Sequence, residues 1–153
     1  MSRAADSASP RGDDQACRVR GNPSFAWPVR VYWEDTDAGG VVYYANYLKF
    51  LERARTEWLS ALGLEQDQLA RRAGVVFVVR RVEADYLRPA RFNDRLQVVS
   101  TLVALKRVSL EMEQHILLGA TRLLSARIQV ACVTHADFRP AKIPAIVTQA
   151  FAD

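Results

Sequence analysis

The sequence predicts an α+β domain in which an antiparallel sheet covers one long helix. Three observations support this prediction. An apolar segment is followed by a helical stretch of about five turns, and the chain then switches to four segments with alternating apolar and polar residues. The connections between these segments are short, which favours antiparallel neighbours. At 153 residues, 50% of them hydrophobic, the chain is long enough to bury one sizeable core.

The first expected element is a strand over residues 27–33, and the long helix follows over residues 45–62. Apolar residues recur in the helical segment at the spacing of a core-facing stripe: Leu48, Leu51, Ala54, Trp58, Ala61 and Leu62. Gly63 fits the position just after a helix, where glycine is favoured. A short second helix is expected over residues 65–73, ending at Gly74.

Alternation with a period of two predicts four further strands, over residues 75–86, 95–105, 110–118 and 122–134. Gly119 and Ala120 suit a two-residue hairpin turn between the last two strands. His115 falls on the polar face of its strand and His135 at a strand end. Both are expected at the surface rather than in catalysis, although histidine is the commonest general base in enzymes.

Residues 1–24 are expected to form a disordered tail, and residues 25–153 a single domain. The tail has little to bury and lacks the apolar run of a signal peptide. No segment approaches the roughly 18 apolar residues of a membrane span, so none is expected. Cys17 lies in the tail and Cys132 on an apolar strand face, so no disulfide framework is predicted and a reducing cytoplasm is compatible.

The net charge of +4 and the pI near 9.4 indicate an anionic partner, such as a phosphorylated cofactor, an acidic carrier protein, a lipid surface or nucleic acid. A charge of this size is also ordinary for a soluble protein. Nucleic-acid binding is not expected, because only the pI favours it and no recognition motif is present. A serine-hydrolase elbow, zinc-ligand spacing, a P-loop and a dinucleotide fingerprint are all missing from the sequence, and no cofactor or metal is predicted.

Asp37 is the strongest candidate for a catalytic residue. It lies in an acid-rich turn, Glu34-Asp35-Thr36-Asp37-Ala38-Gly39-Gly40, just before the long helix. The free N–H groups of a helix N-terminus attract negative charge, so a base or nucleophile here would stand beside an oxyanion site, as acyl transfer requires. The alternative is that Asp35 and Asp37 only cap the turn and the helix. In an extended chain both would point to one side and Glu34 to the other.

Residues 29–43, the following Ala45-Asn46-Tyr47-Leu48 and the run Glu-Arg-Ala-Arg-Thr-Glu at 52–57 resemble the YbgC family of acyl-CoA thioesterases. This family is associated with the Tol-Pal system and related to 4-hydroxybenzoyl-CoA thioesterase, and the resemblance covers roughly residues 27–150. It implies the hotdog fold, a five-stranded antiparallel sheet wrapped around one long helix. It also implies hydrolysis of acyl-CoA to free acid and CoA, a reaction that needs no metal or redox cofactor.

The resemblance also implies roles for individual residues. In the related enzymes the carboxylate at the position of Asp37 either attacks the thioester carbonyl or activates water, and the sequence leaves both mechanisms open. In the 4-hydroxybenzoyl-CoA branch, which carries tyrosine at the position of Tyr44, the backbone N–H there polarises the carbonyl. Many YbgC-like proteins carry histidine here, so Tyr44 puts any imidazole role and the YbgC substrate preference in doubt but leaves the backbone donor intact. Gly40, Val41 and Tyr43 are predicted substrate contacts, with simple packing as the alternative for Tyr43.

Lys106 and Arg107 match a basic hairpin that contacts the nucleotide phosphates of CoA in the related enzymes, a task suited to both side chains. A solvated charged face is the alternative. Family members pair their sheets edge to edge and build each active site from two subunits, which implies a homodimer or a homotetramer. The alternative function is a non-catalytic protein that binds an acyl chain or an acyl carrier protein in a lipid-synthesis assembly.

Overall fold

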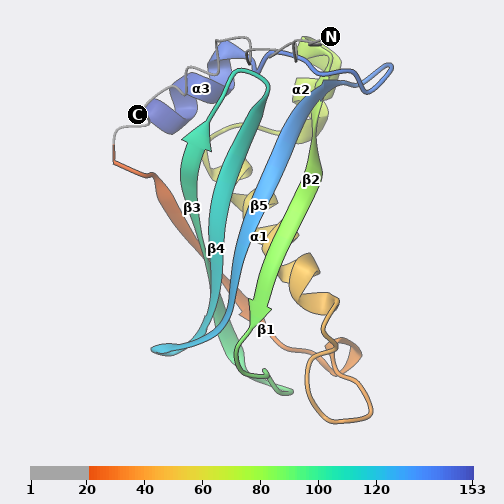
Figure 1. The fold of residues 1–153 in the computed structure, drawn as a ribbon, viewed down its shortest axis with the longest axis vertical. Helices are drawn as coiled ribbons and strands as arrows, with labels where there is room; N and C mark the ends of the chain where they lie inside the picture. The colour runs from red at the N-terminus through yellow and green to blue at the C-terminus, as the bar shows by residue number, and fades with distance from the viewer. Residues whose placement is uncertain (1–20) are drawn as a thin grey trace, which may run out of the picture.

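Five strands form one antiparallel sheet in the computed structural model of the protein, which describes residues 21–153 (Figure 1). The elements follow in the order β1 (Ser24–Arg30), a 3-10 turn η1 (Trp33–Asp35), α1 (Asn46–Ala61), α2 (Gln66–Ala73), β2 (Val75–Tyr86), β3 (Arg95–Leu105), β4 (Ser109–Leu118), β5 (Thr121–Thr134) and α3 (Ala145–Ala152). The spatial order β1-β3-β4-β5-β2 makes β1 and β2 the two edges. The predicted α+β class with a five-stranded antiparallel sheet is confirmed. Most of the predicted tail, including Cys17, lies outside the described residues.

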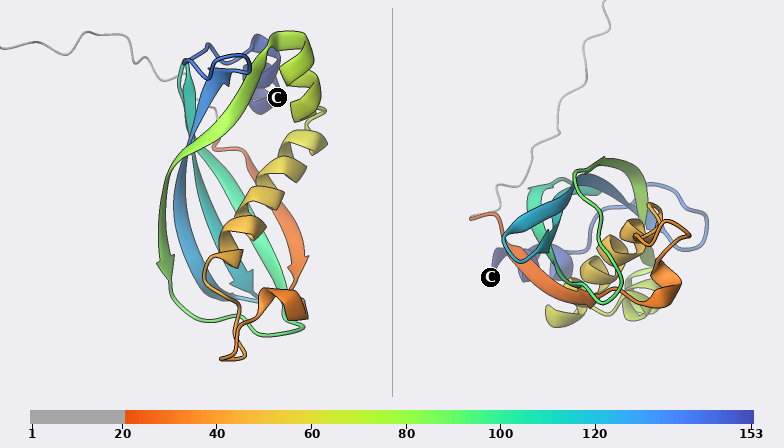
Figure 2. Two further views of the ribbon diagram at one scale, coloured as in Figure 1. Left: turned by 90° about the vertical axis from the view of Figure 1, so that its right-hand side faces the viewer. Right: turned by 90° about the horizontal axis from the view of Figure 1, so that it is seen from below.

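The sheet curves around α1, so the core lies between the helix and the inner face of the sheet (Figure 2). The buried residues of α1 are spaced at intervals of three and four: Tyr47, Phe50, Leu51, Ala54, Trp58 and Leu59. The predicted stripe was wrong for Leu48, which is 39% exposed, and for Ala61, which is also exposed. It missed Phe50, which is fully buried. The buried stripe begins at Tyr47 instead of Leu48, so it is rotated around the helix axis by about one residue from the predicted stripe.

The first strand is shifted from its predicted position and ends at Arg30. The Val31 N–H donates to the Asp94 carbonyl (2.9 Å), and the Val31 carbonyl accepts the Asn93 N–H (3.0 Å). The chain then turns into η1. Its side chains no longer alternate between two faces there, because the backbone is no longer extended. Trp33, 72% exposed, stacks on Phe92 with the ring centroids 4.1 Å apart.

The later strands agree closely with the prediction. β2 and β3 have the predicted bounds, while β4 and β5 each begin one residue earlier. Gly119 and Ala120 form the predicted turn, and the φ of +59° at Gly119 is one that glycine adopts without strain. The second helix, α2, is also present and ends at Gly74, which has a φ of +66°. Cys132 is fully buried on the inner face, as predicted.

The helix α3 was not predicted. Its sequence, Ala-Ile-Val-Thr-Gln-Ala-Phe-Ala, is apolar on most sides and has no clear polar face to give a helical period. Phe151 is buried and meets the Trp58 ring edge-on, with the centroids 5.1 Å apart. Tertiary packing therefore holds this segment as a helix over the end of α1. Among the helices of residues 21–153, none is long and apolar enough to cross a membrane.

A buried polar network joins α1 to the sheet. The Gln114 side-chain amide donates to the Leu51 carbonyl (3.0 Å) and to the Ser100 hydroxyl (2.8 Å). Its carbonyl oxygen accepts a hydrogen bond from Arg55 Nη1 (2.8 Å). Gln114 and Ser100 are fully buried, so these bonds replace the water that both residues lose on folding.

Candidate active site

The loop that carries Asp37, residues 36–44, runs from η1 to the start of α1. It is closed by pairing of Thr36 with Val42 and by the Asp37 N–H, which donates to the Val41 carbonyl (2.9 Å). The Gly40 N–H donates to the Asp37 carbonyl (3.0 Å), which makes residues 37–40 a tight turn with Asp at its first position. Gly40 has a φ of +76°, a conformation that favours glycine.

The Asp37 carboxylate is exposed at this turn. Its Oδ1 accepts the Gly39 N–H (2.8 Å), while within residues 21–153 no donor reaches its other oxygen. A Cβ at Gly39 would lie 3.1 Å from Oδ1, so a side chain there would crowd the carboxylate. One oxygen is therefore oriented by the backbone and the other is open to water or substrate.

Asp35, only two residues away, has a structural role. It is 6% exposed, and its Oδ2 accepts the Tyr32 N–H (2.8 Å). Its carbonyl accepts the Tyr43 N–H (2.9 Å) and the Asn46 side-chain amide (2.9 Å). The expectation that Asp35 and Asp37 point to one side was wrong, because the chain coils into η1 instead of staying extended. Asp35 caps η1, whereas α1 has no side-chain cap.

The backbone at Tyr44 presents a hydrogen-bond donor beside the start of α1. The Tyr43 carbonyl accepts the Asn46 N–H (2.8 Å), and in a trans peptide the Tyr44 N–H points the opposite way. No acceptor for this N–H occurs in the described part of the chain. The Tyr44 carbonyl in turn accepts a hydrogen bond from the Tyr86 hydroxyl (2.9 Å). The peptide groups on both sides of Tyr44 are thus held by hydrogen bonds.

Tyrosine rings form the wall next to this backbone. The Tyr43 and Tyr44 rings meet edge-on at 4.9 Å between centroids, and Tyr86 lies 6.3 Å from Tyr44 and 5.6 Å from Tyr47. An open hollow of about 280 Å³ is lined by Tyr44, Tyr47, Tyr86 and neighbouring, mostly apolar residues. Burial raises the pKa of Tyr47 and of Tyr86, and the Asp37 charge adds to the rise at Tyr47. These phenols are therefore neutral at pH 7.

The predicted site residues fall into two groups in space. Asp37, Gly40, Val41, Tyr43 and Tyr44 share the loop 36–44, which pairs with Arg91 just ahead of β3. Lys106 and Arg107 follow the other end of β3, at the opposite end of the sheet (Figure 1). Eleven residues of strand span about 35 Å. Within one subunit, the structure therefore does not bring the basic pair to the loop.

Asn46 and Tyr86, which donate to the carbonyls of Asp35 and Tyr44, were not predicted from the sequence. Asp35 was considered only as a cap, which is the role it has. The spacing of Asp35 and Asn46 carried no signal, because their contact depends on the fold of the loop. Tyr86 is further away still, at the end of an edge strand.

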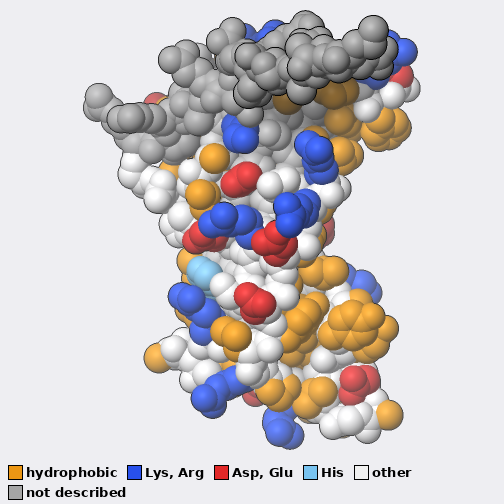
Figure 3. All heavy atoms as spheres, viewed as in Figure 1, with side chains coloured by type: hydrophobic (Ala, Val, Ile, Leu, Met, Phe, Trp, Pro, Cys, Tyr) orange, Lys and Arg blue, Asp and Glu red, His pale blue; other side chains and the backbone are white. Residues whose placement is uncertain are grey.

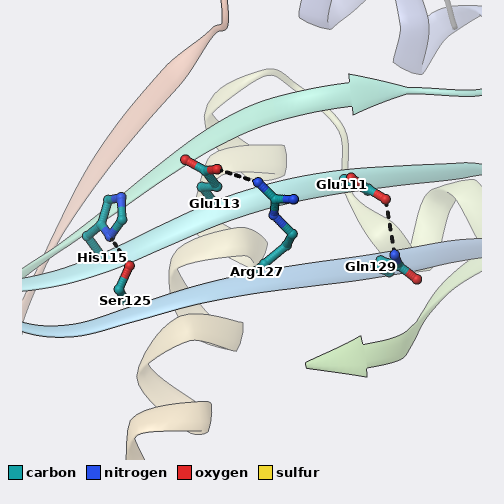
Figure 4. Close-up of polar contacts among 6 residues, drawn as sticks. All are labelled: Glu111, Glu113, His115, Ser125, Arg127 and Gln129. Carbon is teal, nitrogen blue, oxygen red and sulfur yellow. Dashed lines mark hydrogen bonds and ion pairs between the residues drawn. The ribbon is translucent and has the colours of Figure 1, made fainter. Parts of the chain in front are cut away.

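The outer face of the sheet carries a second group of polar side chains (Figure 4). Ser125 Oγ lies 3.0 Å from His115 Nδ1, Arg127 donates to Glu113 (2.8 Å), and Gln129 donates to Glu111 (3.1 Å). Burial, followed by the Arg122 charge, lowers the pKa of His115. His115 is half-buried rather than fully at the surface, and no group of residues among 21–153 has the composition and spacing of a metal site.

Comparison with known proteins places this loop and sheet in a family. Residues 31–151 match the model of the thioesterase-like superfamily. The acyl-CoA thioesterase YbgC of Haemophilus influenzae is 42% identical over 83% of this chain and 93% of its own length. The acyl-CoA thioester hydrolase YbgC of Escherichia coli O6:H1 is 41% identical over 83% of this chain and 95% of its own. The chain belongs to the YbgC family of acyl-CoA thioesterases.

A solved structure agrees with this YbgC assignment. The crystal structure of a probable thioesterase from Bartonella henselae matches with a TM-score of 0.75 and 35% identity, covering 80% of this chain and 100% of that one. The predicted resemblance, the hotdog arrangement and the enzyme class, a thioester hydrolase, are confirmed at the level of the family.

Proposed function

We propose that the protein hydrolyses acyl-CoA thioesters with the Asp37 carboxylate as the reacting group and the Tyr44 N–H as the donor to the thioester carbonyl. The observation that carries this proposal is the pairing of one open carboxylate oxygen with one open backbone N–H on the same loop. Hydrogen bonds fix the backbone at Asp37 and at Tyr44, so both groups are held in place, as a preorganised site requires.

In the general-base form of the mechanism, Asp37 removes a proton from water while the water oxygen bonds to the thioester carbon. The carbonyl oxygen gains negative charge, which the Tyr44 N–H stabilises. The C–S bond then breaks, and the proton held by Asp37 passes to the departing thiolate. The thiol of CoA is a good leaving group because its pKa is near 8.5. In the nucleophilic form, Asp37 itself bonds to the carbon and expels the thiolate, and water then cleaves the mixed anhydride.

The first test is the substitution Asp37→Asn, which keeps the shape and removes the charge. We expect kcat to fall at least about 100-fold, a loss of about 2.7 kcal/mol of transition-state stabilisation, measured by release of free thiol from acyl-CoA. Glu34→Gln is the matched control, because Glu34 is an exposed acid on the adjoining turn, and it should retain activity. Near wild-type turnover in a folded Asp37→Asn protein would refute Asp37 as the reacting group, whereas no thiol release by the wild-type protein would favour a non-catalytic acyl-chain or carrier-protein binder.

Isotope labelling tests the nucleophilic form in which water attacks the mixed anhydride at its aspartyl carbon. Many turnovers in ¹⁸O water should place label in the Asp37 carboxylate if water attacks the anhydride at the aspartyl carbon. Mass spectrometry of the peptide that contains Asp37 detects the label. The general-base form transfers the label to the free acid alone.

Lys106 and Arg107 are proposed to contact the CoA phosphates of a site in a neighbouring subunit, since their own Asp37 lies at the other end of β3. This proposal depends on a homodimer or homotetramer, and sedimentation measures that state. Changing both residues to Ala should mainly raise KM, because remote phosphate contacts hold ground state and transition state alike. The effect should shrink at high salt. A thioester without the nucleotide is the control and should be unaffected.

Equal losses on both substrates would indicate structural damage rather than lost phosphate contacts. Acyl carrier protein as an alternative thioester donor, the cytoplasmic location and the Tol-Pal association stay predictions. A direct rate comparison of acyl-CoA with acyl carrier protein tests the first of these.

A further inference from the structure

A second cavity lies between α1 and the sheet, further along the helix than the Asp37 loop. Its volume is about 100 Å³, and it opens to solvent. Most of its wall is apolar and comes from α1, β2, β4 and β5: Leu59, Phe77, Val79, Leu110, Met112 and Val130. Such a cavity suits an apolar ligand, and the few polar side chains that line it would determine which one.

Arg55 is the cation in this cavity. Its Nη1 donates to Gln114, and no other hydrogen bond or ion pair of its guanidinium occurs within residues 21–153. Among these residues no side-chain nitrogen is both fully buried and unpaired, so the remaining guanidinium nitrogens are accessible from open space. Burial lowers the pKa of Arg55, as expected for a cation without a bonded carboxylate. Its contact with Gln114 uses one of five N–H donors.

Glu52 supplies an acceptor one turn away. Its carboxylate accepts the Thr56 hydroxyl (2.7 Å) and retains further acceptor sites. Glu52 and Arg55 both line the cavity but do not form an ion pair with each other. A hydroxyl group would accept from Arg55 and donate to Glu52 at once. A carboxylate would be repelled by Glu52, and a plain alkyl end would leave the Arg55 donors unpaired.

An apolar strip connects the cavity with the tyrosine wall. Val79, Val82 and Tyr86 point to the α1 side of edge strand β2, in register with the inner residues of β5, and are 39–47% exposed. Leu48 of α1 is also 39% exposed, and α1 faces β2 where Arg55, Phe77 and Val79 line the cavity. Apolar side chains gather beside the lower part of β2, toward the start of α1, on the molecular surface (Figure 3). From Tyr47 to Arg55 the helix rises about 12 Å, a distance that an extended acyl chain can span.

We propose that this cavity binds the far end of the acyl group and that Arg55 and Glu52 select acyl groups that carry a hydroxyl there. The proposal rests on the proposed function, because it assumes that the thioester lies at the Asp37 loop. It adds a substrate class, the ω-hydroxyacyl thioesters of CoA, and it names the end of the acyl chain as the place where the hydroxyl is recognised.

The test compares kcat/KM for plain, ω-hydroxy and ω-carboxy acyl-CoA in a series of chain lengths, measured by thiol release. In the wild-type protein we expect the ω-hydroxy ester to exceed the plain ester by about tenfold, the effect of one well-paired hydrogen-bonding group. The preference should appear only in chains long enough to reach Arg55 and should vanish in shorter ones. Equal rates for plain and ω-hydroxy esters at every length would overturn the proposal without any variant.

Arg55→Met removes the donors and keeps an unbranched stem. It should abolish the hydroxyl preference while the plain ester keeps its rate or gains. Arg53→Met is the matched control, since Arg53 is an exposed arginine on the same helix and outside the cavity, and it should leave the preference intact. Glu52→Gln should raise the relative rate of the ω-carboxy ester several-fold by removing the repelling charge.

Each outcome decides the proposal. Equal losses on plain and ω-hydroxy esters in Arg55→Met, or a change in oligomeric state, would mean that Arg55 only supports Gln114 or a subunit contact. An unchanged ω-carboxy rate in Glu52→Gln would remove Glu52 from the site. Failure of the proposed catalytic role is distinguished by Asp37→Asn. If Asp37→Asn still hydrolyses esters, the catalytic proposal fails. The hydroxyl preference of the wild-type protein and its loss in Arg55→Met can still be measured, so the second proposal is tested separately.

Discussion

The loop 36–44 and the outer face of the sheet both carry polar groups, but these groups are paired on the outer face and partly unpaired in the loop. On the outer face, His115, Ser125, Glu113 and Arg127 bond to one another across neighbouring strands (Figure 4). In the loop, hydrogen bonds hold the backbone, but one oxygen of Asp37 and the Tyr44 N–H have no partner among residues 21–153.

The difference shows that a catalytic residue type alone does not identify a site. Serine, histidine and an acid lie side by side on the outer face, yet Ser125 bonds to the His115 nitrogen that an orienting carboxylate uses in a catalytic triad. The loop offers less familiar residues, but its open carboxylate and open donor lie beside an aromatic hollow. Polar groups held in place and left unpaired are the better sign of chemistry.

The largest effect on the loop, after loss of Asp37, is expected from Asn46→Ala. The substitution removes the side-chain bond to the Asp35 carbonyl and so loosens the segment that holds Tyr44. We expect kcat to fall about tenfold, equal to about 1.4 kcal/mol, with little change in KM. Steady-state kinetics and a melting curve measure this. A parallel loss of folding stability and of binding would instead assign Asn46 a purely structural role.

Tyr86→Phe should have a smaller effect. It removes the bond from the Tyr86 hydroxyl to the Tyr44 carbonyl but keeps the ring contacts with Tyr44 and Tyr47. A single hydrogen bond worth about 1 kcal/mol corresponds to roughly a fivefold fall in kcat. An unchanged kcat would show that the ring contacts alone hold the loop.

Tyr44→Phe should cost less than about twofold in kcat, because the proposed donor is the main-chain N–H and not the phenol. The same measurement with Tyr43→Phe gives the matched control, since the two rings are in contact. A large fall in kcat at constant KM, seen only in the first variant, would show that the Tyr44 hydroxyl acts in the transition state.

On the outer face, His115→Gln should leave activity unchanged and alter only the pH dependence of stability. The folded-state pKa of His115 is lowered, so the unfolded chain binds more protons below about pH 6.5, its usual pKa. Stability should therefore fall as pH drops through this value, and less in the variant. Melting temperatures at pH 7.5 and 5.5 measure it. A loss of thioesterase activity in His115→Gln would show that the outer face of the sheet also takes part in catalysis.

Strands β3 to β5 could be predicted from sequence because each buries one face, so their residues alternate in pattern. The bounds of β2 were also predicted correctly, although most of its side chains are exposed and its register shifts between Val79 and Arg81. The start of the chain could not be placed as well. Val31 is fully buried like a strand residue, but its backbone pairs with Asn93 and Asp94. Helix α3 lacked a polar face and depends on Trp58, which is distant in sequence.

Only the part of the site that lies in one short segment of sequence could be predicted. Asp37 and Gly40 are recognisable from the acid-rich turn and the glycines that close it. The separate role of Asp35 was not, since it depends on a 3-10 turn that alternation does not predict. Tyr86 and Arg55 reach their positions through contacts over 40 or more residues of sequence, with Tyr44 and Gln114 respectively.

The exposed stacked pair of Trp33 and Phe92 gives the protein an optical reporter next to its reactive loop. Of the three tryptophans, Trp58 is 4% exposed in the core and should be shielded from a dissolved quencher such as iodide, and Trp27 on β1 is half-buried. Trp33, at 72%, should be quenched most readily. Trp33 is four residues from Asp37. A molecule that covers this loop would hide the indole from the quencher and leave the core signal unchanged, so occupancy can be followed without a label and without turnover.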